Sequence, residues 1–174
     1  MNRDPQTMRA LRVEQAGGDF LAVELPRPQV GEGQVLLRLH ASGVNPLDTK
    51  IRAGQAAHAH QPLPAVLGID GAGVVEQVDP GVTGWKPGDE VYGMLGGIGG
   101  LQGTLAECIA VDARLLARKP ARLSMREAAA LPLAVITAWE GLVDRAQVKP
   151  GQKVLVQGGA GGVGHIAVQL ARAR

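Results

Sequence analysis

A glycine-rich turn between an apolar strand pattern and an apolar helix pattern is the feature that most limits the fold of this chain. Val154, Leu155 and Val156 form a short apolar run, which is typical of a parallel strand buried on both faces. Residues 159–164 then fit the spacing G-x-G-x-x-G. In such a turn the first glycine allows a tight bend, the second lets the backbone approach a pyrophosphate, and the third lets helix and strand pack closely.

An amphipathic helix is predicted directly after the turn. Apolar side chains recur there at helical spacing: Val163, Ile166, Ala167, Leu170 and Ala171. The N-terminus of a helix offers free N–H groups and a positive dipole end to an anion. The dipole alone contributes only about 0.3–1 kcal/mol, so most of the affinity must come from charge-assisted hydrogen bonds of about 1.5–3 kcal/mol each.

Strand, turn and helix patterns follow one another in the order that a dinucleotide site requires. This order favours a phosphate-binding βα unit over a glycine-rich turn of purely structural use. The residues predicted to contact the cofactor here are Gly159, Ala160, Gly161, Gly162, Val163 and Gly164.

The first two thirds of the chain have the pattern of a turn-rich β domain. The chain has 25 glycines and 11 prolines but only two Trp, one Tyr and one Phe, which suits short strands around an aliphatic core. Strands are expected at residues 11–14, 21–25, 35–41, 74–75, 90–92 and 107–111. Within the third of these, apolar residues alternate with Arg38 and His40, as in a half-buried strand.

A short helix is expected after Asn45. Asn45 suits the N-cap, Pro46 suits the first turn, and Gly54 suits the end of the helix. Residues 55–64 are expected to form a polar loop that contains prolines.

A second pair of helices is expected before the glycine-rich turn. Residues 124–127, Ser-Met-Arg-Glu, have the pattern of a capping box that opens a helix. Pro132 should end or kink that helix, and another should run to about Arg145.

Composition and charge exclude several classes of protein. The net charge of +2 is small and no basic block exists, so a nucleic-acid partner is not expected. Cys108 is the single cysteine, which makes a disulfide framework impossible and favours a reducing cytoplasm. Neither a signal peptide nor a membrane-spanning helix is predicted, because the longest apolar stretch is short and broken by Pro132.

Further motifs stand in a fixed order along nearly the whole chain, at residues 8–10, 43–48, 67–71, 86–89, 131–139 and 151–172. Together they resemble the zinc-independent quinone oxidoreductase (zeta-crystallin-like) branch of the medium-chain dehydrogenase/reductase family. The resemblance implies a mixed α/β chain, with a GroES-like β-barrel domain followed by the first β-α unit of a Rossmann domain. It also implies NADPH as the cofactor, held in the cleft between the two domains, and a homodimer for the full-length protein.

The expected domain boundaries follow from this resemblance. Residues 1–7 are a loose extension, 8–123 the GroES-like domain, 124–150 connecting helices, and 151–174 the start of the Rossmann domain. The residue that selects NAD or NADP lies about 20 positions past the glycines, beyond the last residue here. We therefore expect the N-terminal part of a reductase, either a fragment or a natural truncation, that on its own binds NADPH weakly or not at all and shows no turnover.

Metal ligands of the zinc-containing members are replaced in this sequence. Asn45 stands where those members have a cysteine, and Ile69-Asp70 stands where they have His-Glu. Isoleucine cannot bind zinc, and an asparagine carbonyl is a poor substitute for a thiolate, so no metal is expected. Without a Lewis acid, reduction of an electrophilic quinone or α,β-unsaturated carbonyl is favoured over simple alcohol oxidation.

The resemblance also points to residues near the nicotinamide, each with a plainer alternative. The amide of Asn45 is expected to hold the carboxamide or a substrate oxygen, or only to cap its helix. Asp48 is expected to orient groups beside the ring, or to be a solvated acid of the first turn. Thr137 is expected to line the cleft, or to bond to its own preceding helical turn.

Other polar residues have structural interpretations. Asp70 is expected to be structural, and Cys108 a small buried hydrophobe. His58 and His60 are expected to be solvent-exposed rather than a metal pair, and His165 lies near the predicted phosphates.

Two other functions remain open at this point. The chain could be a non-catalytic truncated protein that pairs with full-length subunits, or, with less support, a zinc-dependent alcohol dehydrogenase. The ligand replacements above oppose the second of these.

Overall fold

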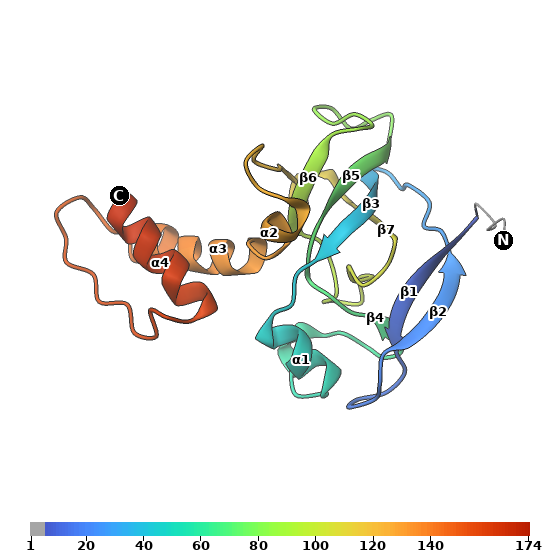
Figure 1. Cartoon of the computed structure of the whole chain (residues 1–174), viewed down its shortest axis with the longest axis horizontal. Coiled ribbons are helices and arrows are strands. Elements are labelled where there is room, and N and C mark those ends of the chain that lie inside the picture. Colours follow the sequence, from blue (N-terminus) through green and yellow to red (C-terminus); the bar gives the residue numbers. More distant parts are fainter. Residues whose placement is uncertain (1–5) are drawn as a thin grey trace. The chain divides into compact units, whose positions relative to one another are not determined.

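The computed structural model describes residues 6–174, which divide into two compact units, Met1–Ala130 and Leu131–Arg174 (Figure 1). The division falls inside the segment 124–150 that was expected to connect two domains. Most of the expected extension at residues 1–7 lies outside the described residues. Thr7 belongs to the first strand, where it pairs with Pro26.

The first unit contains a small antiparallel sheet built from its N-terminal strands. β1 (Thr7–Val13) lies between β2 (Leu21–Pro26) and β4 (Ala65–Val66). Both pairings are antiparallel, and β1 and β2 are paired along nearly their whole length.

A larger antiparallel sheet forms the centre of the first unit. Its strand order is β7 (Cys108–Asp112), β3 (Gln34–Ser42), β5 (Asp70–Val78), β6 (Glu90–Met94) and β8 (Ala117–Arg118). Figure 1 shows β3, β5 and β6 side by side, with the small sheet at the other end of the unit.

The strands of the GroES-like domain lie in two separate sheets within residues 6–174. An isolated bridge between Ala10 and Ala106 joins the two sheets. A barrel closes only when every edge strand has a second neighbour, and the edge strands of residues 6–174 each pair with one strand only.

Apolar side chains from both faces of β3 build the core of the first unit. The main cluster consists of Val35, Leu37, Val75, Val91, Leu95, Ile109 and Val111. On the opposite face, Leu36 packs with Met8 and Cys108. The start of β3 is therefore buried on both faces, whereas Arg38 and His40 further along are exposed as predicted.

The helices of the first unit begin where their capping residues predict. α1 (Pro46–Arg52) has Asn45 as its N-cap, and Gly54 follows it with φ of +71°. The loop at residues 55–64 contains a short 3-10 helix, η1 (Ala57–Ala59), and a second one, η2 (Ala113–Leu115), follows β7.

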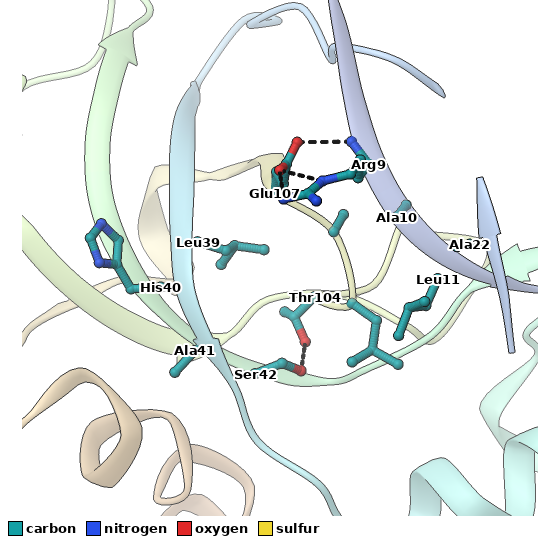
Figure 2. Close-up of a pocket in the computed structure, with 12 residues that line it drawn as sticks. Arg9, Ala10, Leu11, Ala22, Leu39, His40, Ala41, Ser42, Thr104 and Glu107 are labelled. Carbon is teal, nitrogen blue, oxygen red and sulfur yellow. Dashed lines mark hydrogen bonds and ion pairs between the residues drawn. The ribbon is translucent and has the colours of Figure 1, made fainter. Parts of the chain in front are cut away.

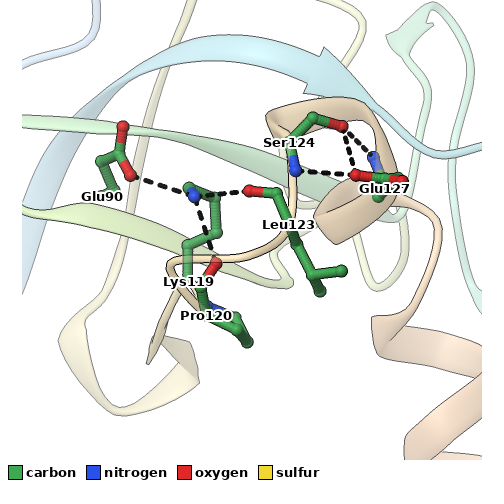
Figure 3. Close-up of polar contacts among 6 residues, drawn as sticks. All are labelled: Glu90, Lys119, Pro120, Leu123, Ser124 and Glu127. Atoms are coloured by element: carbon green, nitrogen blue, oxygen red, sulfur yellow. Dashed lines mark hydrogen bonds and ion pairs between the residues drawn. The ribbon is translucent and has the colours of Figure 1, made fainter.

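α2 (Met125–Ala129) opens with the predicted capping box, in which Ser124 and Glu127 exchange hydrogen bonds (Figure 3). Its buried alanines pack on Ala72 of β5. The turn that leads into α2 is held by Lys119, whose Nζ donates to the Leu123 carbonyl.

The second unit consists of helices and long connections. α3 (Pro132–Trp139) continues into a π-helix, η3 (Glu140–Arg145), and α3 packs against α4 (Gly162–Ala173). Pro132 starts α3, in agreement with the expected break there. Within residues 6–174 no helix combines the length and the apolar character needed to cross a membrane.

The predicted strand at residues 154–156 is wrong for the described structure. Residues 152–156 form no strand, and Leu155 is 94% exposed. A strand forms only beside a hydrogen-bonded neighbour, and the second unit contains no other strand. The helix prediction is confirmed, because the predicted apolar stripe of α4 is its less exposed side.

Candidate cofactor site

The glycine-rich turn of the second unit bends at Gly158, not at Gly159 as the motif suggested. Gly158 has φ of +71°, a left-handed conformation that glycine adopts without steric cost. A Cβ on Gly159 would meet its nearest neighbour at 3.5 Å, an ordinary contact. The N–H of Gly161 donates to the Gly158 carbonyl at 2.9 Å and closes the turn.

Gly164 is the glycine whose missing side chain the turn requires most. A Cβ added to it would lie 2.1 Å from the carbonyl oxygen of Gly158 and 2.8 Å from Cα of Gly159. Both are backbone atoms and cannot move aside without shifting the turn. The third glycine of the motif therefore lets α4 pack against the turn, in place of the strand that the motif suggested.

The start of α4 has the geometry of an anion cradle. Gly161 is the N-cap and makes no side-chain capping bond, and the first intrahelical bond runs from the N–H of His165 to the Gly161 carbonyl. The N–H groups of the first helical residues precede that bond and have no intrahelical partner. A ring nitrogen of His165 lies 2.9 Å from the same carbonyl, which holds the imidazole beside the cradle.

Thr137 is the other predicted site residue of this unit. It hydrogen-bonds to its own preceding helical turn, as the alternative interpretation predicted. It is exposed on α3, and its Oγ1 donates to the Leu133 carbonyl at 2.7 Å. This bond is the usual one for a threonine inside a helix. The predicted position beside the nicotinamide stays a prediction.

In the first unit, Asn45 is bound by two carboxylates. Its backbone N–H donates to Oδ2 of Asp48 at 2.7 Å, as part of the capping box of α1. Its side-chain Nδ2 donates to Oδ2 of Asp70 at 3.0 Å. The helix-cap interpretation of Asn45 is thus correct, and a cofactor contact of the same side chain stays a prediction.

The loop that carries Asn45 packs against the C-terminal end of α2. A Cβ on Gly43 would lie 2.2 Å from the Ala129 carbonyl oxygen and 3.0 Å from Cβ of Asp70. The N–H of Gly43 also donates to the Asp70 carbonyl at 2.9 Å. Only glycine permits this close approach, so the position of Asn45 depends on the last turn of α2 and on Asp70.

Asp48 is partly buried, whereas the alternative interpretation predicted an acid exposed to solvent in the first turn of the helix. Its Oδ1 is buried and makes no hydrogen bond of normal distance and angle to residues 6–174. Burial raises the pKa of this carboxyl above its ordinary value of 3.8, against the opposing effect of the N–H groups of Asn45 and Ile69.

Asp70 lies entirely inside the first unit, with 0% of its surface exposed. Its backbone carbonyl accepts a hydrogen bond from Oγ1 of Thr104 at 2.9 Å, and that hydroxyl lies 2.7 Å from Oγ of Ser42. Sequence reasoning missed the bond between Asp70 and Asn45. No local pattern signals it, because the two residues are 25 positions apart and meet only through the packing of β5 against the Asn45 loop.

A cavity of about 420 Å³ opens elsewhere in the first unit, between β1, β3 and residues 104–107 (Figure 2). Arg9 and Glu107 form an ion pair on its wall, with 2.7 Å between the closest atoms. The bonded hydroxyls of Ser42 and Thr104 also line it (Figure 2). None of the predicted site residues lines this cavity.

The histidines and the cysteine take the structural roles expected of them. His58 and His60 are exposed, and Cys108 is 5% exposed. Within residues 6–174 no three His, Cys, Asp or Glu side chains are grouped so as to hold a metal ion.

The candidate site residues therefore form two groups. Asn45 and Asp48 belong to the first unit, whereas Thr137 and the glycine-rich turn belong to the second. The first unit is a β domain, and the second carries the glycine-rich turn followed by α4.

Comparison with known proteins gives the family. Residues 31–121 match the alcohol dehydrogenase GroES-like domain, and the chain belongs to this family. The family predicted from the sequence motifs is thereby confirmed, and so is the mixed α/β fold class, whereas independence from zinc stays a prediction.

Two curated relatives are similar to nearly all of this chain. One is the 2-methylene-furan-3-one reductase of Solanum lycopersicum, at 45% identity over 97% of the chain and 45% of the relative. The other is the chloroplastic NADPH-dependent alkenal/one oxidoreductase of Arabidopsis thaliana, at 43% identity with the same coverage. The chain thus spans about half the length of these relatives.

Solved structures show the same fold. An alcohol dehydrogenase superfamily protein from Novosphingobium aromaticivorans matches with a TM-score of 0.95 and 63% identity, over 96% of this chain and 51% of that one. The quinone oxidoreductase from Coxiella burnetii matches with a TM-score of 0.81 and 32% identity, over 96% and 54%.

Proposed function

We propose that this chain is the N-terminal part of an NADPH-dependent oxidoreductase that reduces an α,β-unsaturated carbonyl or a quinone without zinc. The enone is the preferred acceptor, because the names of both curated relatives describe reduction of compounds of this class. The name of one solved relative keeps a quinone open as the second acceptor.

The observation that carries the proposal is the fit of the turn at residues 158–164 to a diphosphate. The missing Cβ of Gly164 brings the turn against the first residues of α4, where backbone N–H groups have no intrahelical partner. Such a backbone cradle binds phosphate oxygens in dinucleotide sites. Gly161, Gly162, Val163 and Gly164 would hold the diphosphate, with Gly159 and Ala160 beside it.

NADPH would supply a hydride to the acceptor when it is bound. The residues of this chain would then orient the reacting groups and exclude water from them. Asn45 and Asp48 would lie beside the nicotinamide from the first unit, and Thr137 from the second.

Zinc does not fit the residues at the corresponding positions. The amide nitrogen of Asn45 already donates a hydrogen bond to Asp70. Ile69 is 0% exposed, and its side chain has no atom that could bind a metal. A zinc site needs three or four donor side chains that converge on one point. The chemistry of this site would instead depend on orientation and on hydrogen bonds.

We propose further that the full-length protein is a homodimer in a reducing compartment such as the cytoplasm. The buried and unpaired Cys108 is compatible with that environment.

The proposal is tested with the natural protein that contains these residues. Oxidation of NADPH is followed by absorbance with an enone, a quinone and a simple ketone as acceptors, with and without a chelator. We expect turnover with the enone, less with the simple ketone, and no effect of the chelator. Activity that disappears with the chelator and returns with zinc would contradict the proposal.

A further inference from the structure

The side chain of Asn45 donates a hydrogen bond to a carboxylate that is fully buried. Asp70 is 0% exposed, and Asn45 is 8% exposed. The hydrogen bond from Nδ2 of Asn45 to Oδ2 of Asp70 is 3.0 Å long and lies in the interior of the first unit. A hydrogen bond to a carboxylate in such surroundings is stronger than one between neutral groups.

This bond fixes which end of the amide points inward. An asparagine side chain has a donor end and an acceptor end, and a carboxylate oxygen accepts only. The nitrogen of Asn45 must therefore face Asp70, and the oxygen must face away from it. The close packing of Gly43 against the Ala129 carbonyl and Asp70 holds the backbone that carries Asn45 in place, so the side chain stays within reach of Asp70.

We propose that Asp70 is a positioning residue that makes Asn45 present a hydrogen-bond acceptor, not a donor, to the bound ligand. The matching ligand group carries an N–H or O–H. Under the function proposed above, on which this inference rests, that group is the primary amide of the nicotinamide. The carbonyl oxygen of the substrate would then have to find its donor elsewhere.

Two variants separate positioning from simple stabilisation. Asp70→Asn has the same size but offers both a donor and an acceptor, so the amide of Asn45 is free to adopt either orientation. The double variant Asn45→Asp with Asp70→Asn restores a donor facing a carboxylate but reverses the direction of the bond. The double variant should recover the melting temperature of the parent, and its carboxylate at position 45 should still present an acceptor to the ligand.

The readout is the preference of the natural protein for NADPH over its 3-acetylpyridine analogue, in which a methyl ketone replaces the amide. The parent should bind NADPH about tenfold more tightly than the analogue, since the analogue has no N–H to donate. Asp70→Asn should lose most of this preference, whereas the double variant should keep it, because a carboxylate at position 45 can only accept a hydrogen bond from the ligand. The inference is overturned if the parent shows no preference, if Asp70→Asn keeps it, or if the double variant loses it.

A second readout does not depend on the cofactor. In ¹⁵N NMR spectra the side-chain amide protons of Asn45, identified by their loss in Asn45→Asp, should exchange slowly in the parent and quickly in Asp70→Asn. Fast exchange in the parent would refute the role of Asp70. Absence of NADPH oxidation with slow exchange would refute the proposed function and leave the orientation of Asn45 intact.

Discussion

Gly164 is the residue whose substitution tests the cofactor cradle most cleanly. Its added Cβ in Gly164→Ala would lie 2.1 Å from the Gly158 carbonyl oxygen, so the turn must shift. We expect the affinity of the natural protein for NADPH to fall at least about tenfold, because small displacements of backbone donors lose charge-assisted hydrogen bonds. Calorimetric titration with NADPH measures the change.

Gly141→Ala is the matched control, since a Cβ there meets nothing within 4 Å. Gly141 lies in η3, outside the glycine-rich turn, and alanine is tolerated well in a helix. Equal losses of affinity in both variants would show that the close contact at Gly164 does not matter for binding.

Asp48 gives a prediction for the pH dependence of stability. Burial, partly offset by the N–H groups of Asn45 and Ile69, raises the pKa of this carboxyl above 3.8 in the folded protein. The folded state therefore binds the proton more tightly than the unfolded state. The contribution of Asp48 to stability is fully present below the unfolded pKa and is lost as the pH rises through the raised folded value.

Asp48→Asn removes this titration. The free energy of unfolding of the parent minus that of the variant should decrease as the pH rises from about 3 to about 6, near the range where carboxyl groups titrate. Urea unfolding at a series of pH values measures this difference. A difference that increases over the same range would mean that the hydrogen bonds outweigh burial at Asp48.

At the scale of elements, Lys119 holds the turn that leads into α2. Its side chain is only 6% exposed. Its Nζ donates to the carbonyls of Leu123 at 2.6 Å and Pro120 at 3.2 Å, and lies 3.1 Å from Glu90 (Figure 3). These bonds fix the path from β8 to α2, and α2 in turn supports the loop that carries Asn45.

Lys119→Met keeps the length of the side chain but removes the donor. We expect a loss of about 1–3 kcal/mol in the free energy of unfolding, since the carbonyls lose their partner. The exposed Lys153, changed to Met, should alter it by less than about 0.5 kcal/mol. Urea unfolding of the three proteins compares them, and similar stability of both variants would exclude a role for Lys119 in fixing α2.

Elements were predicted well where their signals are local. The capping box of Ser124 and Glu127 and the start of α1 after Asn45 lie within a few residues of the turns that they define. The strand at residues 154–156 failed, because a strand depends on a neighbour that the local sequence does not supply.

At the scale of the whole molecule, the motif order predicted the family and the mixed α/β fold class. The strands of residues 6–174 lie in two open sheets, since closure depends on which edges meet. For the site, the sequence pointed to the glycine-rich turn and to Asn45. It did not reveal that Gly158 makes the bend or that Asp70 orients Asn45, because both depend on three-dimensional packing.

The most direct test of the account is the crystal structure of the natural protein with NADP⁺ bound. We predict that the diphosphate lies at the start of α4, within hydrogen-bond distance of the backbone N–H groups of residues 161–164. A diphosphate bound at any other part of the molecule would contradict it.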